Sequence, residues 1–182
     1  FVCVNAHQQT SASHIFAAGD VTGGLMLVPQ AIQEGYIAGT NAVRESNMTT
    51  GDQVIPIGSF TDPEYAQVGL TQAKACASHD VLCVVVGFDS TTRTIIDGRT
   101  FGFCKLLVDR ASYKILGCHV VGERAVEITQ VGAIAIAAGM RVDDLARVPL
   151  SFPTYAGILG RLAASATRQL NLKLDGLTAV RE

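Results

Sequence analysis

A short apolar run that ends in Gly-Asp is the part of this sequence whose residue types could bind a ligand. Residues 15–18, Ile-Phe-Ala-Ala, are typical of a buried β-strand, and Gly19 and Asp20 follow directly. Gly19 lets the backbone come close to a ligand, and Asp20 offers two acceptor oxygens to ribose-type hydroxyls. This is how α/β proteins present a carboxylate to a nucleotide cofactor. The alternative, in which Gly-Asp only ends a strand at a turn, stays open at this point.

A helix is predicted a few residues after this turn. Gly23 and Gly24 indicate a loop, Pro29 suits a first helical turn, and residues 30–43 continue as a helix. Free backbone N–H groups at the start of this helix would suit a phosphate or an electron-rich, partly anionic ring.

The composition excludes several classes of protein. Only 16% of the 182 residues are charged and 48% are apolar, an apolar excess that an oligomer interface would explain. The balance of 14 basic and 16 acidic residues, without a basic run, argues against nucleic acid or an anionic membrane as a partner. No apolar stretch approaches the roughly 18–20 residues that a membrane-spanning helix needs.

The cysteines and histidines indicate no metal centre. Five cysteines at irregular spacing, without a Cys-x-x-Cys pair, fit reduced thiols in a cytoplasmic protein, and three of them are expected in the core: Cys83, Cys104 and Cys118. His119 lies in a predicted strand and is expected to be structural, and the other histidines show no metal spacing. The chain begins Phe1-Val2 without an initiator Met or a signal peptide, so we expect a piece of a longer protein.

A polar segment divides the chain into two predicted domains, residues 1–50 and 51–182. Residues 44–53 have no apolar period and are rich in turn formers, which is typical of a linker. Beyond it, strands are predicted at 54–60, 81–86, 101–109 and 113–121, with the last two forming a hairpin. Helices are predicted at 71–78, 123–138 and 155–170, with a short helical turn at 142–145. The continuous apolar run at 81–86 indicates a strand without an exposed face. Strands followed by helices on one side predict an α+β fold with an antiparallel sheet, preceded by a fragment of an α/β domain.

The order of these segments resembles one enzyme family. Thr10 through Val43 is similar to the second flavin-contacting segment of the pyridine nucleotide-disulfide oxidoreductases, the family of dihydrolipoamide dehydrogenase, glutathione reductase and mercuric reductase. The remainder resembles the dimerisation domain of the same family through four motifs in the same order: Ser59-Phe60-Thr61-Asp62-Pro63-Glu64 with Val68-Gly69-Leu70-Thr71, Gly102-Phe103-Cys104-Lys105-Leu106, Ile115-Leu116-Gly117-Cys118-His119-Val120-Val121-Gly122, and Ala125-Val126-Glu127-Ile128.

The resemblance implies a cofactor, a cosubstrate and a partner. In a complete enzyme, Asp20 beside Gly19 would hold the ribityl chain of FAD, and the backbone at Leu27, Val28 and Ala31 would lie near the flavin ring. NAD(P)H would reduce the flavin, which would pass electrons to a small-molecule acceptor, and the protein would be a homodimer.

The sequence departs from the family where a proton carrier is expected. Members that reduce disulfides have His-Pro-Thr before the last helix, followed three residues later by a Glu that orients the His. Here Phe152 and Gly157 occupy those two positions, and neither can move or orient a proton. Mercuric reductases also depart from His-Pro-Thr, but they end in a vicinal cysteine pair that this chain lacks. Tyr155 is a candidate polar group near the flavin of the partner chain, or else an interface aromatic with a satisfied hydroxyl.

Two further components of such an enzyme are missing from these residues. There is no Gly-x-Gly-x-x-Gly phosphate loop after a strand, and there is no redox cysteine pair. We therefore expect the chain alone to be inactive and to supply the flavin-facing segment and the subunit interface of an oxidoreductase. The alternative is a non-catalytic dimerisation or scaffold module, which would not need Asp20 or the helix at 30–43.

Overall fold

The computed structural model describes residues 1–44, 47–51 and 53–173. It divides into two compact units, Phe1–Ile55 and Pro56–Glu182, which are described separately. The division follows the turn-rich segment at 44–53.

Unit 1 consists of the 3-10 helix η1 (Gly19–Thr22), the long helix α1 (Val28–Arg44) and irregular segments around them. The strand predicted at residues 15–18 is wrong. Phe16 makes a single antiparallel bridge with Gln9, and Ile15 is 48% exposed. A buried strand needs a pairing strand on each side, and the described part of unit 1 offers only this one bridge.

Helix α1 confirms the helix predicted after the glycine loop. Pro29 is its second residue, where its missing N–H removes no helical hydrogen bond. Ile37 and Asn41 are buried on one side, and the Asn41 side chain ties α1 to the backbone of His7 and Met48. Apolar side chains on other parts of the helix are exposed: Val28, Ile32, Tyr36 and Val43.

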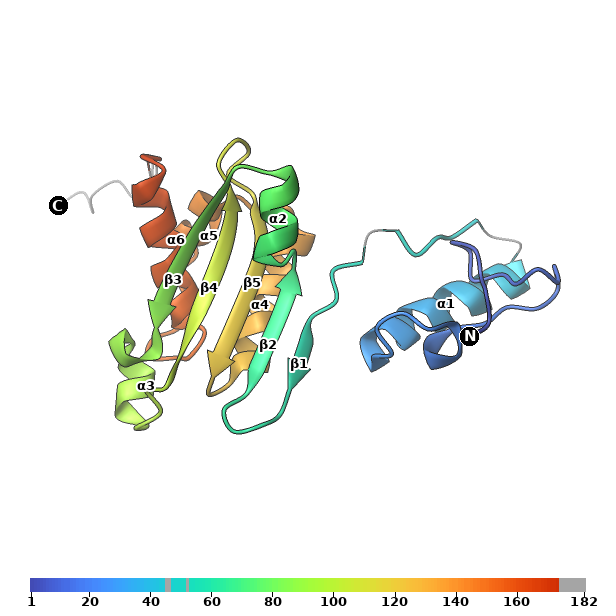
Figure 1. Ribbon diagram of the computed structural model, residues 1–182, viewed down its shortest axis with the longest axis horizontal. Helices are drawn as coiled ribbons and strands as arrows, with labels where there is room; N and C mark the ends of the chain where they lie inside the picture. The colour runs from blue at the N-terminus through green and yellow to red at the C-terminus, as the bar shows by residue number, and fades with distance from the viewer. Residues whose placement is uncertain (45–46, 52, 174–182) are drawn as a thin grey trace. The chain divides into compact units, whose positions relative to one another are not determined.

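Unit 2 is built on a five-stranded antiparallel sheet of order β1-β2-β5-β4-β3 (Figure 1). The strands are β1 (Ile57–Ser59), β2 (Tyr65–Gly69), β3 (Val81–Gly87), β4 (Gly102–Asp109) and β5 (Ile115–Gly122). The hairpin predicted from residues 101–121 is confirmed as β4 and β5, which occupy the middle of the sheet beside β3 and β2.

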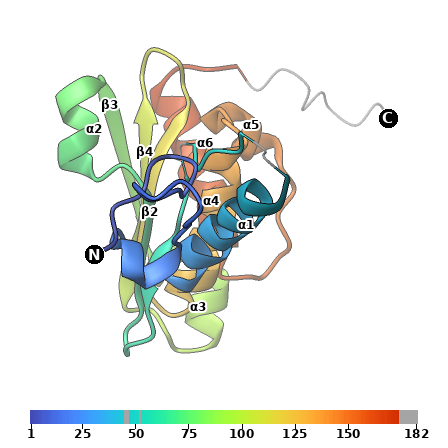
Figure 2. The ribbon, with the colours of Figure 1, turned by 90° about the vertical axis from the view of Figure 1, so that its right-hand side faces the viewer.

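Helices cover one face of this sheet more fully than the other. The helices of unit 2 are α2 (Gln72–Ser78), α3 (Thr92–Ile96), α4 (Ala125–Ala137), α5 (Val142–Arg147) and α6 (Gly157–Gln169), with the 3-10 helix η2 (Phe88–Ser90) before α3. Figure 2 shows α4, α5 and α6 on one side of the sheet and α2 on the other. This arrangement confirms the predicted α+β class.

The core lies between the sheet and helices α4 and α6. Strand residues of alternate positions, including Val68, Leu106 and Val120, face the helices and are at most 1% exposed. They meet Ile128 of α4 and Leu162 of α6, both fully buried. Each such side chain stabilises the fold by about 1.5–3 kcal/mol through loss of apolar surface to water.

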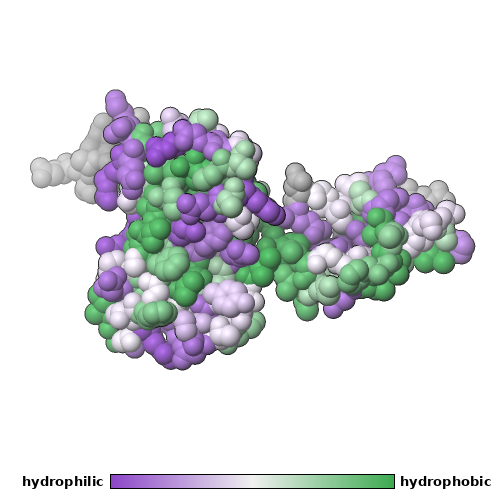
Figure 3. All heavy atoms as spheres, in the orientation of Figure 1, coloured by the Kyte–Doolittle hydropathy of each residue, from purple (hydrophilic) through white to green (hydrophobic). Residues whose placement is uncertain are grey.

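The opposite face of the sheet carries a mixed set of side chains. The strand register places Gln67, His119, Lys105 and Val85 in one row across β2, β5, β4 and β3. Figure 3 shows this face as a mixture of hydrophobic and hydrophilic surface. Val85 is 54% exposed, so the prediction that residues 81–86 have no exposed face is wrong. Leu82 and Val84 are buried on the face that the helices cover, and Val85 lies on the other face.

The helix boundaries have local causes. Thr71 accepts a hydrogen bond from Lys74 N and caps α2. Gly139 follows the end of α4 with a φ of +62°, the left-handed conformation that glycine adopts without steric cost. The sequence reading missed η2 and α3, although Gly98 after α3, also at positive φ, is the same type of stop signal.

Candidate functional site

The Gly19–Asp20 turn lies against the first turn of α1. Gly19 has a φ of +76°, and a Cβ atom placed on it would come within 3.3 Å of Ala31 Cβ. Glycine is therefore required for both conformation and space. The Asp20 carbonyl accepts the Gly23 N–H at 3.1 Å, while its side chain is exposed and receives no hydrogen bond from the described residues. The turn thus presents an unpaired carboxylate beside a helix N-terminus.

The other predicted cofactor-facing residues lie at that helix start. Val28 begins α1 and is 72% exposed, and Leu27 accepts the Ala31 N–H at 3.0 Å. The structure therefore brings Gly19 next to Ala31 and leaves Val28 open to a ligand. A helix start also carries a partial positive charge that favours an anionic group.

The sequence reading missed a buried carboxylate beneath the turn. Glu34 is only 6% exposed and accepts hydrogen bonds from Gly19 N at 2.7 Å and Gln30 Nε2 at 2.6 Å. Thr22 Oγ1, which donates to Gly19 O at 2.8 Å, lies 3.3 Å from Glu34 Oε2. The sequence did contain a signal for this carboxylate. Gln30 and Glu34 are polar residues four positions apart on the first two turns of a helix, and such pairs share a helix face.

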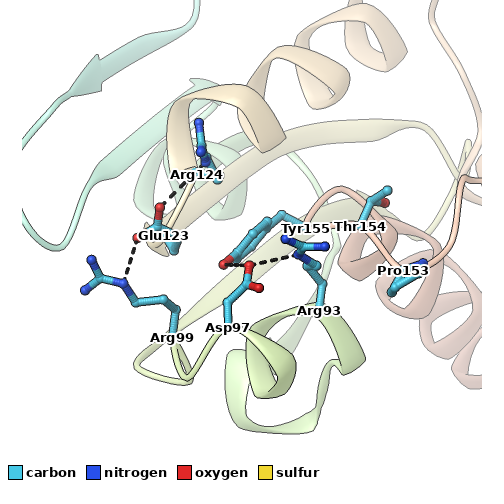
Figure 4. A pocket seen from close by; sticks show the side chains of 8 residues that line it. All are labelled: Arg93, Asp97, Arg99, Glu123, Arg124, Pro153, Thr154 and Tyr155. Carbon is cyan, nitrogen blue, oxygen red and sulfur yellow. Dashed lines mark hydrogen bonds and ion pairs between the residues drawn. The ribbon is translucent and has the colours of Figure 1, made fainter.

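Unit 2 contains a separate cleft of about 420 Å³ beside the segment that precedes α6 (Figure 4). Its charged lining consists of Arg93, Asp97, Arg99, Glu123 and Arg124. Glu123 pairs with Arg99 at 3.3 Å and with Arg124 at 3.6 Å, so the cleft is bridged by ion pairs.

Tyr155 projects into this cleft and is bound within its own subunit. Its hydroxyl donates to Asp97 Oδ2 at 2.8 Å, and Arg93 Nε donates to the same oxygen at 2.8 Å. The Tyr155 hydrogen bond and Arg93 lower the pKa of Asp97, while desolvation and the Asp97 carboxylate raise the pKa of Tyr155 to about 12. Tyr155 is therefore a protonated donor whose hydroxyl hydrogen is bonded to Asp97. This satisfied hydroxyl agrees with the second of the two alternatives given for Tyr155 in the sequence analysis.

The two positions of the family's proton-carrying pair contain no proton carrier. Phe152 is 79% exposed, and Gly157 is the first residue of α6, where its N–H donates to Thr154 Oγ1 at 3.2 Å. The Phe152 ring therefore lies on the surface of unit 2, and Gly157 lies at the start of a helix.

Cys104, Cys118 and His119 have structural environments, whereas Cys83, which was expected in the core, is only half-buried. Cys104 and Cys118 are both buried with their sulfur atoms 4.0 Å apart, and this contact together with burial raises the pKa of the Cys104 thiol. His119 Nε2 lies 3.0 Å from Leu70 O, and burial lowers its pKa. Among the described residues, no group of three or more His, Cys, Asp or Glu could hold a metal ion. None of the helices in that part of the chain is long and apolar enough to span a membrane.

Comparison with known proteins identifies the family. The family model for the dimerisation domain of pyridine nucleotide-disulphide oxidoreductases matches residues 55–163, which cover most of the described sheet and helices of unit 2. The chain belongs to this family. The resemblance inferred from the four motifs is thereby confirmed, and the antiparallel sheet with its helices is the fold of that domain.

Individual relatives cover both units. The chain is 36% identical over 156 residues to a mercuric reductase of Lysinibacillus sphaericus, and the matched region covers 85% of this chain and 29% of the relative. It is 31% identical over 180 residues to a dihydrolipoyl dehydrogenase of Buchnera aphidicola, spanning 96% of this chain and 38% of the relative. The chain therefore spans roughly a third of the length of these relatives.

Solved structures show the same fold. LpdA from Mycobacterium tuberculosis matches with a TM-score of 0.84 and 28% identity over 91% of this chain and 36% of that chain. The HOCl-induced flavoprotein disulfide reductase RclA from Escherichia coli matches with a TM-score of 0.83 over 89% of this chain and 38% of its own, and at 24% identity it shows the fold alone.

Proposed function

We propose that this chain supplies the flavin-facing segment and the dimerisation domain of an FAD-dependent NAD(P)H oxidoreductase, similar to mercuric reductase or dihydrolipoyl dehydrogenase. The observation that carries the proposal is the exposed carboxylate of Asp20 in η1, which has no hydrogen-bond partner among the described residues, in a chain whose second unit is this family's dimerisation domain. Residues 1–50 are then the end of an FAD-binding domain, and residues 51–182 are the dimerisation domain.

The residues present fit FAD. Asp20 offers acceptor oxygens that no described residue occupies, and the positive φ and missing Cβ of Gly19 keep the turn close to Ala31. Asp20 would hold ribityl hydroxyls, and the backbone at Leu27, Val28 and Ala31 would lie along the ring. The bound flavin would accept a hydride from NAD(P)H and pass electrons to a small-molecule acceptor.

The exposed apolar side of α1 supports the proposal that unit 1 is part of a larger domain. Val28, Ile32 and Tyr36 are each at least 66% exposed, on a helix whose opposite side is buried in unit 1. Isolated surface apolar residues are common, but a run along one helix indicates a face that another layer covers.

The enzyme would differ from the disulfide reductases of its family. Phe152 and Gly157 cannot replace a His–Glu pair, and the Tyr155 hydroxyl is bound to Asp97. We propose that the acceptor is one whose reduction does not need a proton from this position. The isolated chain, without a phosphate loop or a redox cysteine pair, would not be catalytically competent.

We further propose a cytoplasmic homodimer without nucleic acid or membrane partners. In the described part of unit 2, the segment before α6 carries a large exposed apolar side chain, Phe152, and the five cysteines are free thiols. Free thiols are typical of a reducing compartment. The second candidate function is a non-catalytic dimerisation or scaffold module; it is disfavoured by the unpaired Asp20, which a scaffold does not need.

The test is Asp20→Ala in a complete protein that carries this chain. Loss of a charge-assisted hydrogen bond to a ligand hydroxyl should weaken FAD binding by about 1.5–3 kcal/mol, or roughly 10-fold to 150-fold in Kd. Asp80→Ala in unit 2 is the matched control, because it removes the same charge from a carboxylate that is 79% exposed. Equal Kd values for Asp20→Ala and the unmodified protein, measured by flavin fluorescence titration, would assign Asp20 to the turn alone and favour the scaffold.

The isolated 182-residue chain is expected to bind FAD weakly or not at all, because it holds only part of the site. Gel filtration followed by absorbance at flavin wavelengths tests this. A yellow sample with stoichiometric flavin would contradict the proposal that further domains complete the site.

A further inference from the structure

We propose that Glu34 is a positioning residue that fixes the Asp20 turn for flavin binding. It does so through a series of hydrogen bonds that includes Gln30 and in which each donor and each acceptor has a fixed place. This inference rests on the proposed function, since it assigns Asp20 to the cofactor.

The chain of hydrogen bonds holds the loop at both ends. At one end, the Gly19 N–H donates to Glu34 Oε2 at 2.7 Å, immediately before Asp20. At the other end, the Leu25 N–H donates to Gln30 Oε1 at 2.8 Å. Gln30 Nε2 then donates to Glu34 Oε1 at 2.6 Å and joins the two ends through one helix face. The stretch from Gly19 to Leu25 that carries Asp20 is therefore tied to α1 at both ends.

The bonds fix the direction of every donor in this chain. Because Gln30 accepts from Leu25, its amide nitrogen must point at Glu34, and because the Gly19 N–H also points at Glu34, both carboxylate oxygens must accept. Only a carboxylate has two acceptor oxygens and no donor. A glutamine at position 34 would turn its NH₂ group toward either Gly19 N–H or Gln30 Nε2, and one buried donor would lose its partner.

Because Glu34 is buried, a mismatch between donors and acceptors around its carboxylate would be costly. Glu34 is 6% exposed, so water cannot readily replace a lost partner. The Gly24 backbone also lies close to Gln30, since a Cβ atom built on Gly24 would come within 3.0 Å of the Gln30 amide nitrogen. A change at either side chain should therefore shift the loop and with it the Asp20 carboxylate.

Exchanging the two residues provides a stringent test. Glu34→Gln leaves two donors facing each other, and Gln30→Glu places two carboxylates about 2.6 Å apart if the side chains do not move. The double variant Gln30→Glu with Glu34→Gln restores every bond: position 30 accepts from Leu25 and from position 34, and position 34 accepts from Gly19. Each single variant is expected to raise the Kd for FAD roughly tenfold, and the double variant to return within about twofold of the unmodified protein.

The experiment measures FAD affinity in a complete protein that carries this chain, with Asn41→Ala as the control. Asn41 is another 6%-exposed polar residue of α1, and its hydrogen bonds go to His7 and Met48 instead of the Asp20 loop. Asn41→Ala should lower thermal stability without changing the FAD Kd by more than about twofold. In the 182-residue chain, hydrogen exchange of the Gly19 amide should be slow, faster in both single variants, and slow again in the double variant.

Recovery of both FAD affinity and Gly19 protection in the double variant supports the positioning role. If Asp20→Ala weakens FAD binding but Glu34→Gln does not, the positioning role is wrong and the proposed function stands. If the double variant stays as weak as the single variants, or if Asn41→Ala weakens FAD binding equally, the polarity argument is overturned. If neither Asp20→Ala nor Glu34→Gln affects FAD binding, both the positioning role and the proposed function fail.

Discussion

Phe152→Asp is expected to dissociate the homodimer while leaving the folded subunit intact. Phe152 precedes α6, at the position where the family resemblance places a histidine, and its ring is 79% exposed in the single chain. The neighbouring Tyr155 is bound to Asp97, and Leu159 is fully buried in its own subunit. Among residues 152 to 159, Phe152 is therefore the large apolar side chain that is free to contact a partner.

The exposed fraction sets the magnitude of the effect. A phenylalanine buries about 200 Å² when fully enclosed, so 79% exposure leaves on the order of 160 Å² to cover, worth about 4 kcal/mol at 25 cal/mol per Å². Association does not recover all of this, and interface anchors typically cost 2–4 kcal/mol when truncated. We therefore expect each Phe152→Asp side chain to cost about 3 kcal/mol. Because a two-fold interface contains two copies of this residue, the total of about 6 kcal/mol raises the dimer Kd on the order of 10⁴-fold. A buried, unpaired carboxylate would add to this cost.

Sedimentation equilibrium of the 182-residue chain measures this Kd, and urea unfolding of the same samples at concentrations where both are monomeric checks the fold. Phe101→Asp is the control, because Phe101 is 72% exposed in unit 2 but lies outside the segment before α6. A well-folded monomer of the unmodified chain at high micromolar concentration would refute the homodimer. A dimer that tolerates Phe152→Asp but not Phe101→Asp would move the interface elsewhere.

Two predictions concern stability. Thr129→Val should stabilise unit 2 by about 1–2 kcal/mol, since the Thr129 hydroxyl is buried without a hydrogen-bond partner among the described residues. Thr167→Val should instead cost about 0.5–1.5 kcal/mol, because it removes the 2.8 Å hydrogen bond from Thr167 Oγ1 to Ala163 O. Urea midpoints that shift in the same direction for both variants would contradict this reasoning. His119 has a pKa lowered from 6.5, chiefly by burial, so its charged form is disfavoured in the folded state. The unfolding free energy should therefore fall as the pH drops from about 6.5 through the folded pKa; His119→Gln should flatten this part of the profile, and an unchanged slope would exclude His119 as its source.

The sequence predicted those elements whose signals are local. The β4–β5 hairpin and the helices at 71–78 and 123–138 were predicted because the periodicity of apolar residues is a local signal. The errors arose where the pairing or burial of a segment depends on other parts of the fold. Residues 15–18 and 81–86 have similar apolar runs, but the first has one bridging residue and the second is covered by the large helices on one face only. A run of apolar residues does not reveal which strands pair with it or which layers cover it.

The candidate site shows the same limit. Gly19 and Asp20 were found because the Gly-Asp pair is contiguous with an apolar run and a helix start. Glu34 was missed because its partners lie 4 and 15 residues away in the chain and meet only after the loop folds back on α1. The role of Tyr155 likewise depended on Asp97, 58 residues distant in sequence.

Photolabelling with an azido derivative of FAD tests the central claim most directly. A complete protein that carries this chain would be loaded with the photoreactive flavin, irradiated and digested, and the labelled peptides would be identified by mass spectrometry. The account predicts labelling within residues 19–31, which hold the Asp20 turn and the start of α1. Stoichiometric flavin binding with labels confined to other peptides would contradict the claim that this segment faces the cofactor.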